Sequence, residues 1–248
     1  MGENFRRKAC FVAGGHTTEV PESIITYSSV VSRDSVRLAF TIAALNGLKV
    51  MACDIQNAYL TADCREKIWT IGGPEFGSEA GTIFLIKKAL YGLKSAGAAF
   101  CSLLADTLVD VGYRPTKADP DVWLRPAVKA DGFEYYEMVL CYVDDILSMS
   151  HDPHATLNAL KSVLKLLKDD NIAEPDIYLG AQIGKMTIDQ SECWTMSAEN
   201  YVVASVKNVE DTTLAKSGLR LPTKCYTPLS SDYRPELETS GELKRDGV

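Results

Sequence analysis

The sequence predicts an α+β fold, in which helices pack on one face of an antiparallel sheet. Segments with the apolar spacing of helices alternate with β-rich segments, in the order strand, helix, strands, helix, hairpin, helix. Two apolar runs, 138–143 and 146–149, flank Asp144-Asp145 and indicate a tight β-hairpin. The 248 residues are 46% hydrophobic and 24% charged, which suits a folded protein with a core of its own.

Four helices are predicted from capping residues and stop signals beside apolar stripes. They run from Ser32 to Asn46, from about Gly97 to Val111, from Asp152 to Asp169, and onward from Ser197. The third carries the stripe Leu157, Leu160, Leu164 and Leu167, and the fourth carries Val202, Val206 and Val209. Each stripe occupies a single helical face.

The strands are predicted from β-rich runs bounded by turn residues. They cover residues 8–12, 49–55, 82–86, 122–125 and 135–142, with a further hairpin from 177–183 and 193–196. Prolines interrupt the polar segment 221–248, which we expect to be an extended or partly disordered tail.

The composition limits the classes of function. A net charge of −7 and a pI of about 5.1 count against a nucleic-acid binder, so such a role needs a local basic groove. The seven cysteines form no CxxC pair, which favours a reducing compartment over a zinc site or disulfides. No apolar run can span a bilayer and no signal peptide opens the chain. We therefore expect an intracellular protein that is not secreted.

Three aspartates are the candidate catalytic centre. Alternate strand residues share a face, so Asp54 and Asp144 converge at one end of the sheet if their strands are neighbours, with Asp145 beside them in the turn. Clustered carboxylates repel one another unless a cation is present, and a pair of Mg²⁺ ions would relieve the repulsion. Two such ions can activate a hydroxyl and stabilise a leaving oxygen in phosphoryl transfer. The alternative is that Asp144-Asp145 does no more than form a turn.

Several segments resemble motifs of one family. Tyr142-Val143-Asp144-Asp145 resembles the YxDD box of reverse transcriptases, and residues 54–60 (DIQNAYL) resemble their first aspartate motif. Residues 89–94 (ALYGLK) and 118–123 (ADPDVW) are similar to segments of the copia branch. Residues 12–16, 178–180 and 227–229 resemble the fingers segment, the primer-contacting hairpin and the boundary beyond the thumb. The matches follow family order, so the chain resembles the reverse transcriptase domain of copia-type (Pseudoviridae) LTR retrotransposons.

The resemblance implies a palm with a ferredoxin-like sheet, together with fingers and a partial thumb. The core would cover residues 1–235, with fingers and palm at about 1–175 and the primer-grip hairpin and thumb at about 176–220. The implied reaction is RNA-directed DNA synthesis, in which two Mg²⁺ ions (or Mn²⁺) assist attack of a primer 3′-hydroxyl on a dNTP. The implied partners are an RNA or DNA template-primer and the ribonuclease H and integrase parts of a polyprotein. The chain would then be a fragment acting in a cytoplasmic virus-like particle.

The resemblance also assigns roles to residues. The metals would be held by Asp54, Ile55, Asp144 and Asp145. The nucleotide would be bound by Lys8, Gln56, Asn57, Ala58, Tyr59, Tyr91, Gly92 and Lys94. The primer and template would contact Tyr142, Val143, Leu179 and Gly180. Without the family, Tyr59 is equally well interpreted as a core aromatic and Lys8 as a surface lysine.

Some residues depart from the family pattern. Cys10 stands where a basic residue is usual, and Ala98-Ala99-Phe100 replaces a stretch that commonly includes Arg and Trp. Both changes would weaken binding of nucleotide or template. Cys10, the acidic pI and the lack of the other polyprotein parts favour a second hypothesis, an inactive remnant that at most binds nucleic acid or protein. Three weaker signals have plainer interpretations. His151 and His154 could suggest metal binding but fit a helix start. Lys161, Lys165 and Lys168 could contact phosphates but fit a solvated helix face, and Trp69, Trp123 and Trp194 could stack on bases but fit core packing.

Overall fold

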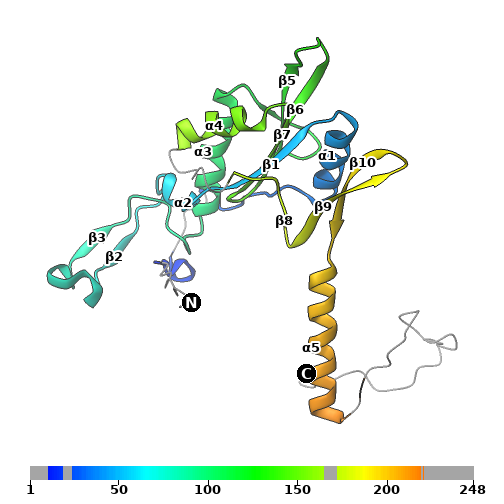
Figure 1. Ribbon diagram of the computed structural model, residues 1–248. Helices are drawn as coiled ribbons and strands as arrows, with labels where there is room; N and C mark the ends of the chain where they lie inside the picture. The colour runs from blue at the N-terminus through cyan, green and yellow to red at the C-terminus, as the bar shows by residue number, and fades with distance from the viewer. Residues whose placement is uncertain (1–10, 19–23, 165–171, 219, 221–248) are drawn as a thin grey trace, which may run out of the picture. The chain divides into compact units, whose positions relative to one another are not determined.

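The computed structural model describes residues 11–18, 24–164, 172–218 and 220 (Figure 1). The chain divides into two compact units, Met1–Ser197 and Ala198–Val248. In the described part of the second unit, helix α5 covers Glu199–Ser217. Its N-cap is Ala198, so the predicted cap at Ser197 is wrong by one residue. No helix within the described ranges has the length and apolarity that a membrane span requires.

The first unit is built on a five-stranded antiparallel sheet in the order β1-β7-β6-β5-β4 (Figure 1). The strands are β1 (Lys49–Asp54), β4 (Arg114–Pro115), β5 (Val122–Val128), β6 (Glu134–Tyr142) and β7 (Asp145–Ser150). The long hairpin of β6 and β7 lies in the centre, and β1 pairs along the full length of β7. The predicted α+β class with an antiparallel sheet is confirmed.

Helices cover both faces of this sheet, and the prediction of helices on one face only is wrong. Helices α3 (Ala96–Asp110) and α4 (Pro153–Leu164) pack in one core with Val139 and Ile146, whereas α1 (Arg33–Leu45) packs in a second core with Leu140 and Leu147. The continuous apolar run of β6 is the physical reason. Consecutive strand residues point to opposite faces, so an uninterrupted run requires cover on both.

Shorter elements surround the sheet. They are η1 (Gly15–Thr17), α2 (Ala58–Thr61), and the antiparallel sheet of β8 (Ile177–Tyr178), β9 (Ala181–Ile188) and β10 (Ser191–Ser197). The predicted hairpin near residue 180 is confirmed by the pairing of β9 with β10. Of the predicted strand 8–12, Phe11 and Val12 have no regular structure and the rest lies outside the described residues, as do Leu167 and the tail 221–248.

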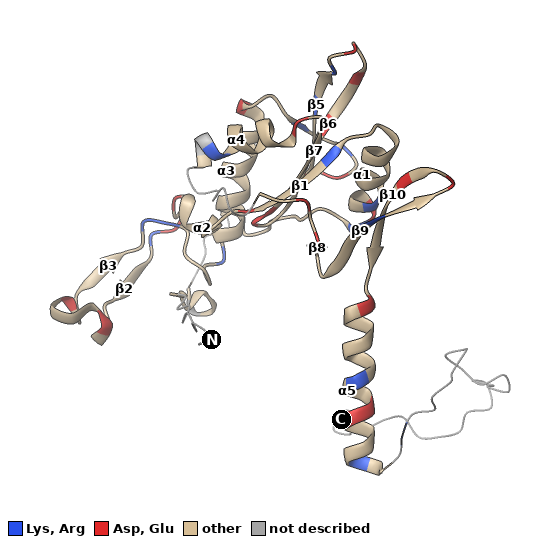
Figure 2. Ribbon diagram, in the orientation of Figure 1, with Lys and Arg blue, Asp and Glu red and all other residues tan. Residues whose placement is uncertain are grey.

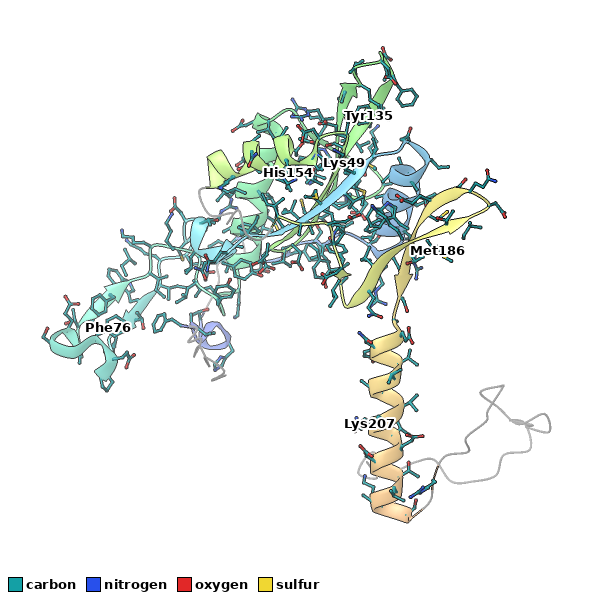
Figure 3. The ribbon with its side chains drawn as sticks, viewed as in Figure 1. Lys49, Phe76, Tyr135, His154, Met186 and Lys207 are labelled. Atoms are coloured by element: carbon teal, nitrogen blue, oxygen red, sulfur yellow. The ribbon has the colours of Figure 1, made fainter. Side chains whose placement is uncertain are left out.

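A two-stranded arm projects from the sheet near α2 (Figure 1). It consists of β2 (Trp69–Ile71), which the sequence did not predict, and β3 (Ile83–Leu85), joined by η2 (Pro74–Glu79). Lys and Arg residues lie near its root, and acidic residues lie at its tip (Figure 2). Phe76 lies toward the tip and stacks on Phe84 with ring centroids 5.2 Å apart (Figure 3). Helices α1 and α3, the start of α4, and strands β1, β3, β5, β6 and β7 lie within a few residues of their predicted positions, whereas α2 and β4 were not predicted. The predicted end of the third helix lies outside the described residues.

Asp119 ties the start of α1 to the loop before β5. Its carboxylate accepts hydrogen bonds from the Ser32 N–H at 2.9 Å, the Ser35 hydroxyl at 2.6 Å and the Asp121 N–H at 3.1 Å. The adjoining backbone continues to the end of β6, because the Cys141 N–H donates to the Asp121 carbonyl. Burial raises the pKa of Asp119, but the hydrogen bonds outweigh it and hold the pKa below its ordinary value.

We expect Asp119→Asn to lower the free energy of unfolding by about 1–3 kcal/mol, because bonds to a charged carboxylate are lost. A depressed folded pKa stabilises the protein above the unfolded pKa, and this stability disappears as pH falls through the folded pKa. The difference from wild type in urea unfolding should therefore shrink below about pH 4. Asp131→Asn in the exposed β5–β6 turn is the control, and a difference independent of pH would contradict the assignment.

Candidate active site

The three aspartates meet at one end of the main sheet. Asp54, the last residue of β1, pairs directly with Asp145, the first residue of β7. Asp145 also pairs on its other side with Tyr142, the last residue of β6. Asp144 lies in the turn, and its carbonyl accepts the Ile55 N–H at 2.8 Å. Segments far apart in the sequence thus bring together the carboxylates that the metal hypothesis requires, while the role of each carboxylate stays a prediction.

The turn differs in one detail from the predicted geometry. Its two central residues are Val143 and Asp144, since Tyr142 pairs with Asp145. Val143 has a φ of 54°, a positive φ at the first central position, as in the turns that suit a two-residue hairpin. Asp145, and not Asp144, is therefore the direct cross-strand partner of Asp54. Cross-strand partners share a face, so Asp54, Tyr142 and Asp145 point to the same side of the sheet.

That side opens into a cavity of about 800 Å³. Besides the three residues just named, its lining includes Arg33, Tyr178, Leu179 and Gly180. Leu179 and Gly180 have φ values of 50° and 77° and form the turn between β8 and β9. The turn at Leu179 and Gly180, predicted to contact the primer, thus lines the same cavity as Asp54 and Asp145. Sequence reasoning missed Arg33, because a charged residue at a helix start gives no signal beyond the helix itself.

The surroundings of Asp145 disfavour its charged form. Burial raises the pKa of Asp145, and the negative charges of Asp144 and Asp54 raise it further. The pKa of the Cys53 thiol is also raised, to about 12. Burial is the main cause, and the negative charges of Asp54 and Asp145 add to it. A divalent cation would reverse this repulsion, and carboxylate oxygens are the ligands that Mg²⁺ prefers.

The side chains do not yet form a closed set of metal ligands. Within the described ranges, no three His, Cys, Asp or Glu side chains are grouped so that they could hold a metal ion. The donor chemistry at the three aspartates nevertheless fits a hard cation. The backbone pairing places Asp54 beside Asp145, and Asp144 follows in the adjoining turn.

Tyr59 lies beside the turn, close to Asp144. Its ring is 4.8 Å from that of Tyr91 and 6.1 Å from that of buried Phe100, centroid to centroid. Burial raises the pKa of Tyr59, and the charge of Asp144 adds to the effect. The half-buried ring is held in place by packing, as both interpretations of Tyr59 require. Between Asp54 and Tyr59 the chain turns at exposed Gln56 and Asn57, the latter with φ 58°, and Ala58 is buried.

Two glycines hold residues 11–18 against the segment around Tyr91. The Ala13 N–H donates to the Tyr91 carbonyl at 2.7 Å. A Cβ on Gly92, whose φ is 89°, would lie 2.1 Å from the Ala13 carbonyl oxygen, and one on Gly15 would lie 1.9 Å from the Gly92 oxygen. Only glycine fits at these positions. The Lys94 ammonium donates to the Thr18 carbonyl at 2.8 Å, and Lys8 lies outside the described residues.

Glu66 is a second buried acid that the sequence did not point to. Its Oε1 accepts hydrogen bonds from the Ser95 hydroxyl and, at 3.2 Å, from the Ser95 N–H. It thereby joins the chain after α2 to the start of α3, directly after Lys94.

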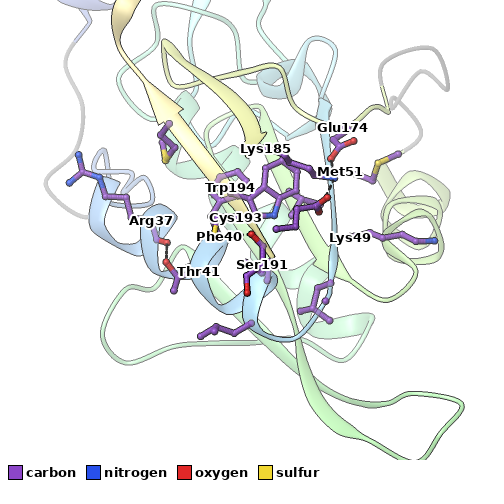
Figure 4. Close-up of a pocket in the computed structure, with 18 residues that line it drawn as sticks. Arg37, Phe40, Thr41, Lys49, Met51, Glu174, Lys185, Ser191, Cys193 and Trp194 are labelled. Atoms are coloured by element: carbon purple, nitrogen blue, oxygen red, sulfur yellow. Dashed lines mark hydrogen bonds and ion pairs between the residues drawn. The ribbon is translucent and has the colours of Figure 1, made fainter. Parts of the chain in front are cut away.

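A larger cavity, of about 920 Å³, lies near the start of β1, between α1 and the β9–β10 hairpin (Figure 4). Trp194 packs there against Phe40, with ring centroids 5.2 Å apart. The Lys185 ammonium lies 4.6 Å from the centroid of the Trp194 ring and forms ion pairs with Glu174 and Glu192. None of the predicted site residues lines this cavity. Trp194 and buried Trp123 thus pack as expected, but Trp69 is 57% exposed and the expectation of core packing is wrong for it.

Comparisons with known proteins agree with the resemblance. The family model for reverse transcriptase (RNA-dependent DNA polymerase) matches residues 2–224. The chain is 26% identical over 180 residues to the Retrovirus-related Pol polyprotein from transposon RE1 of Arabidopsis thaliana. It is 30% identical over 179 residues to that from transposon TNT 1-94 of Nicotiana tabacum, and 30% identical over 165 residues to the Truncated transposon Ty1-A Gag-Pol polyprotein of Saccharomyces cerevisiae.

These alignments cover 71%, 71% and 65% of the chain, but only 12%, 13% and 12% of the respective polyproteins. No solved structure gives a significant match. Because the family model matches most of the chain, the chain belongs to the reverse transcriptase (RNA-dependent DNA polymerase) family, in its copia-type retrotransposon branch.

Proposed function

We propose that this chain is the polymerase module of a retrotransposon polyprotein, adding dNTPs to a primer 3′-hydroxyl under the direction of an RNA or DNA template. The observation that carries the proposal is the pairing of Asp54 with Asp145, with Asp144 in the adjoining turn. Template-primer and dNTPs are the proposed substrates, and the ribonuclease H and integrase parts of a longer polyprotein are the proposed partners. The proposed compartment is a cytoplasmic virus-like particle.

Asp54, Asp144 and Asp145, with Ile55, would hold two Mg²⁺ ions, for which Mn²⁺ could substitute. The bound ions would supply activation of the primer hydroxyl and stabilisation of the leaving oxygen. The Ile55 N–H keeps Asp144 in place by bonding its carbonyl. Gln56, Asn57 and Ala58 would present backbone to the triphosphate, since the left-handed conformation of Asn57 turns the chain there.

The remaining predicted residues divide between nucleotide and primer. Tyr59 and Tyr91, packed ring on ring, would form the floor beneath the sugar, with Gly92 beside them. Lys94 would act through the Thr18 segment that it holds, and Lys8 keeps its proposed contact with the triphosphate. Tyr142, Leu179 and Gly180 would contact the primer end from the cavity that they line, and Val143 would contact it from the turn.

An inactive remnant that binds nucleic acid or protein is the alternative. The net charge of −7 and the open set of carboxylates favour it. The assembled aspartate pairing favours the enzyme, because a turn alone does not need a third carboxylate supplied by another strand.

Primer extension tests the catalytic role of the aspartates. The wild-type protein should extend oligo(dT) on poly(rA) with Mg²⁺ or Mn²⁺. Asp144→Asn should lower the rate of incorporation by on the order of 10³-fold or more, because a charge that lowers the barrier is removed. Asp189→Asn in the exposed β9–β10 turn is the matched control and should extend normally. A folded wild type that incorporates nothing supports the remnant instead.

Thermal unfolding tests the repulsion between the carboxylates of the site. Without divalent ions, Asp145→Asn should melt at a higher temperature than wild type, because a half-buried like charge is removed. Added Mn²⁺ should stabilise wild type by about 2.7 kcal/mol at a hundredfold excess over its dissociation constant, and stabilise Asp145→Asn much less. Thermal unfolding with and without a chelator measures both effects. A wild type that is indifferent to Mg²⁺ and Mn²⁺ would remove the support for a metal centre.

Substitutions at Tyr59 test whether this residue selects the sugar of the incoming nucleotide. If Tyr59 excludes a 2′-hydroxyl by bulk, Tyr59→Val should raise the ratio of ribonucleotide to deoxynucleotide incorporation at least about tenfold, whereas Tyr59→Phe should leave it unchanged. Single-nucleotide kinetics give kcat/KM for each sugar. Equal ratios in all three proteins would return Tyr59 to the role of a core aromatic.

A further inference from the structure

The β2–β3 arm carries an exposed apolar face that the proposed reaction does not use. Trp69 pairs with Leu85 and Ile71 with Ile83, so these four side chains share one face. Trp69, Ile71 and Ile83 are 57%, 69% and 64% exposed. The opposite face bears Phe84, which stacks on Phe76, and Phe76 in turn contacts Phe11. One face of the arm is therefore covered by aromatic packing, while the other lies open.

Lysines continue the open face toward the root of the arm. The Ile86 N–H donates to the Ile68 carbonyl at 2.9 Å, which extends the strand register by one pair. Lys67 stands two residues before Trp69 and Lys87 two residues after Leu85, so the two lysines flank the root ends of β2 and β3. Continuing the strand alternation by one pair beyond the Ile68–Ile86 contact puts them on the face of Trp69 and Leu85. Both lysines are exposed. The charge along the arm is graded, because Glu75 and Glu79 lie in the element at its tip (Figure 2).

This gradient favours a polyanion at the root over a protein partner spread along the whole arm. Although the net charge of the chain is −7, exposed Lys67 and Lys87 flank the root ends of β2 and β3, close in sequence to the most exposed tryptophan, Trp69. Cations next to an open aromatic face are how proteins hold single-stranded nucleic acid without reading its sequence. Acidic residues at the tip would repel phosphates and limit the strand to the root.

The root also adjoins the candidate active site. The Ala89 N–H donates to the Ala62 carbonyl at 3.0 Å, and Asp63 pairs with Lys88. These contacts attach the arm between α2, which contains Tyr59, and the segment that contains Tyr91. A strand lying on the arm face would therefore lead toward the nucleotide side of the aspartates.

We propose that the arm face, defined as Lys67, Trp69, Leu85 and Lys87, binds the single-stranded template ahead of the primer end. Trp69 stacks on an unpaired base, and the two lysines contact the flanking phosphates. Only the identity of the strand as template rests on the proposed polymerase function. Binding of a single strand at this face does not depend on it.

The test compares two fluorescent template-primer hairpins, one blunt and one with a 5′ template extension of about eight nucleotides. Binding is measured by anisotropy in an Asp144→Asn background without dNTP, so that polymerase activity plays no part. Trp69→Ala should weaken binding of the extended hairpin about tenfold and leave the blunt hairpin unchanged. Trp69→Phe should restore most of the affinity, because a ring is present again.

The lysines are tested by the salt dependence of the same binding. Lys67→Gln and Lys87→Gln should each reduce the slope of log affinity against log salt by about 0.7, whereas Trp69→Ala should leave the slope unchanged. Lys49→Gln, at the far end of β1 from Asp54, and Tyr136→Ala, an exposed aromatic on β6, are the controls and should bind as wild type.

Equal affinity of wild type and Trp69→Ala for the extended hairpin would overturn the proposal, whether or not the enzyme is active. So would a wild type that does not distinguish the two hairpins. If Trp69→Ala instead converts a dimer to a monomer in sedimentation without changing extension-dependent binding, the face is a self-association surface and the proposal is wrong. If the protein binds the extended hairpin through Trp69 but never incorporates nucleotides, the arm face binds a single strand and the proposed polymerase function is wrong.

Discussion

The register between β1 and β7 is the constraint on which the site depends. It sets Asp54 opposite Asp145, and the two-residue turn then fixes Asp144 next to both. Side chains alternate along a strand, so a slip of one residue would turn Asp54 to the other face and would also move Val50 out of its core. The apolar residues that bury both faces of the sheet therefore hold the register, and the carboxylate geometry follows from packing rather than from any attraction among the carboxylates.

The same packing holds together groups that repel. Burial and the neighbouring charges raise the pKa of Asp145, so the apo site stores an unfavourable interaction that the surrounding core must outweigh. Leu140 and Leu147 on one face, and Val139 and Ile146 on the other, supply that core directly behind the turn. Residues held in an unfavourable arrangement by their surroundings are typical of sites built for a ligand. Each cause of the raised pKa of Asp145, whether burial or a neighbouring carboxylate, would be offset by a nearby positive charge.

Local signals predicted the elements well and their three-dimensional relations less well. Ser32 and Gly112 mark helix ends in both sequence and structure, and the apolar runs around Asp144 form the predicted hairpin. The second layer of helices was missed because the one-face pattern was assumed, although the uninterrupted apolar run of β6 requires cover on both sides. Trp69 was missed because composition gives no information about exposure, and β2 is too short to show an alternating pattern. The approach of Gly15 to Gly92 is a backbone contact between distant segments, which spacing within either segment cannot reveal.

An acidic chain can still bind a polyanion if its positive and negative charges are separated in space. The aspartates lie at the end of the sheet, where a cation would reverse their effect on phosphate, and the acids of the arm lie at its tip. The cations Lys67 and Lys87 lie between these two acidic regions, next to the exposed ring of Trp69. Screening limits each charge to about 8–10 Å at physiological salt, so a phosphate at the root responds mainly to the charges there, which include Lys67, Lys87 and the Asp63–Lys88 ion pair. The net charge, which counts against a nucleic-acid partner, is a sum over the whole chain. A bound strand responds mainly to the charges close to it.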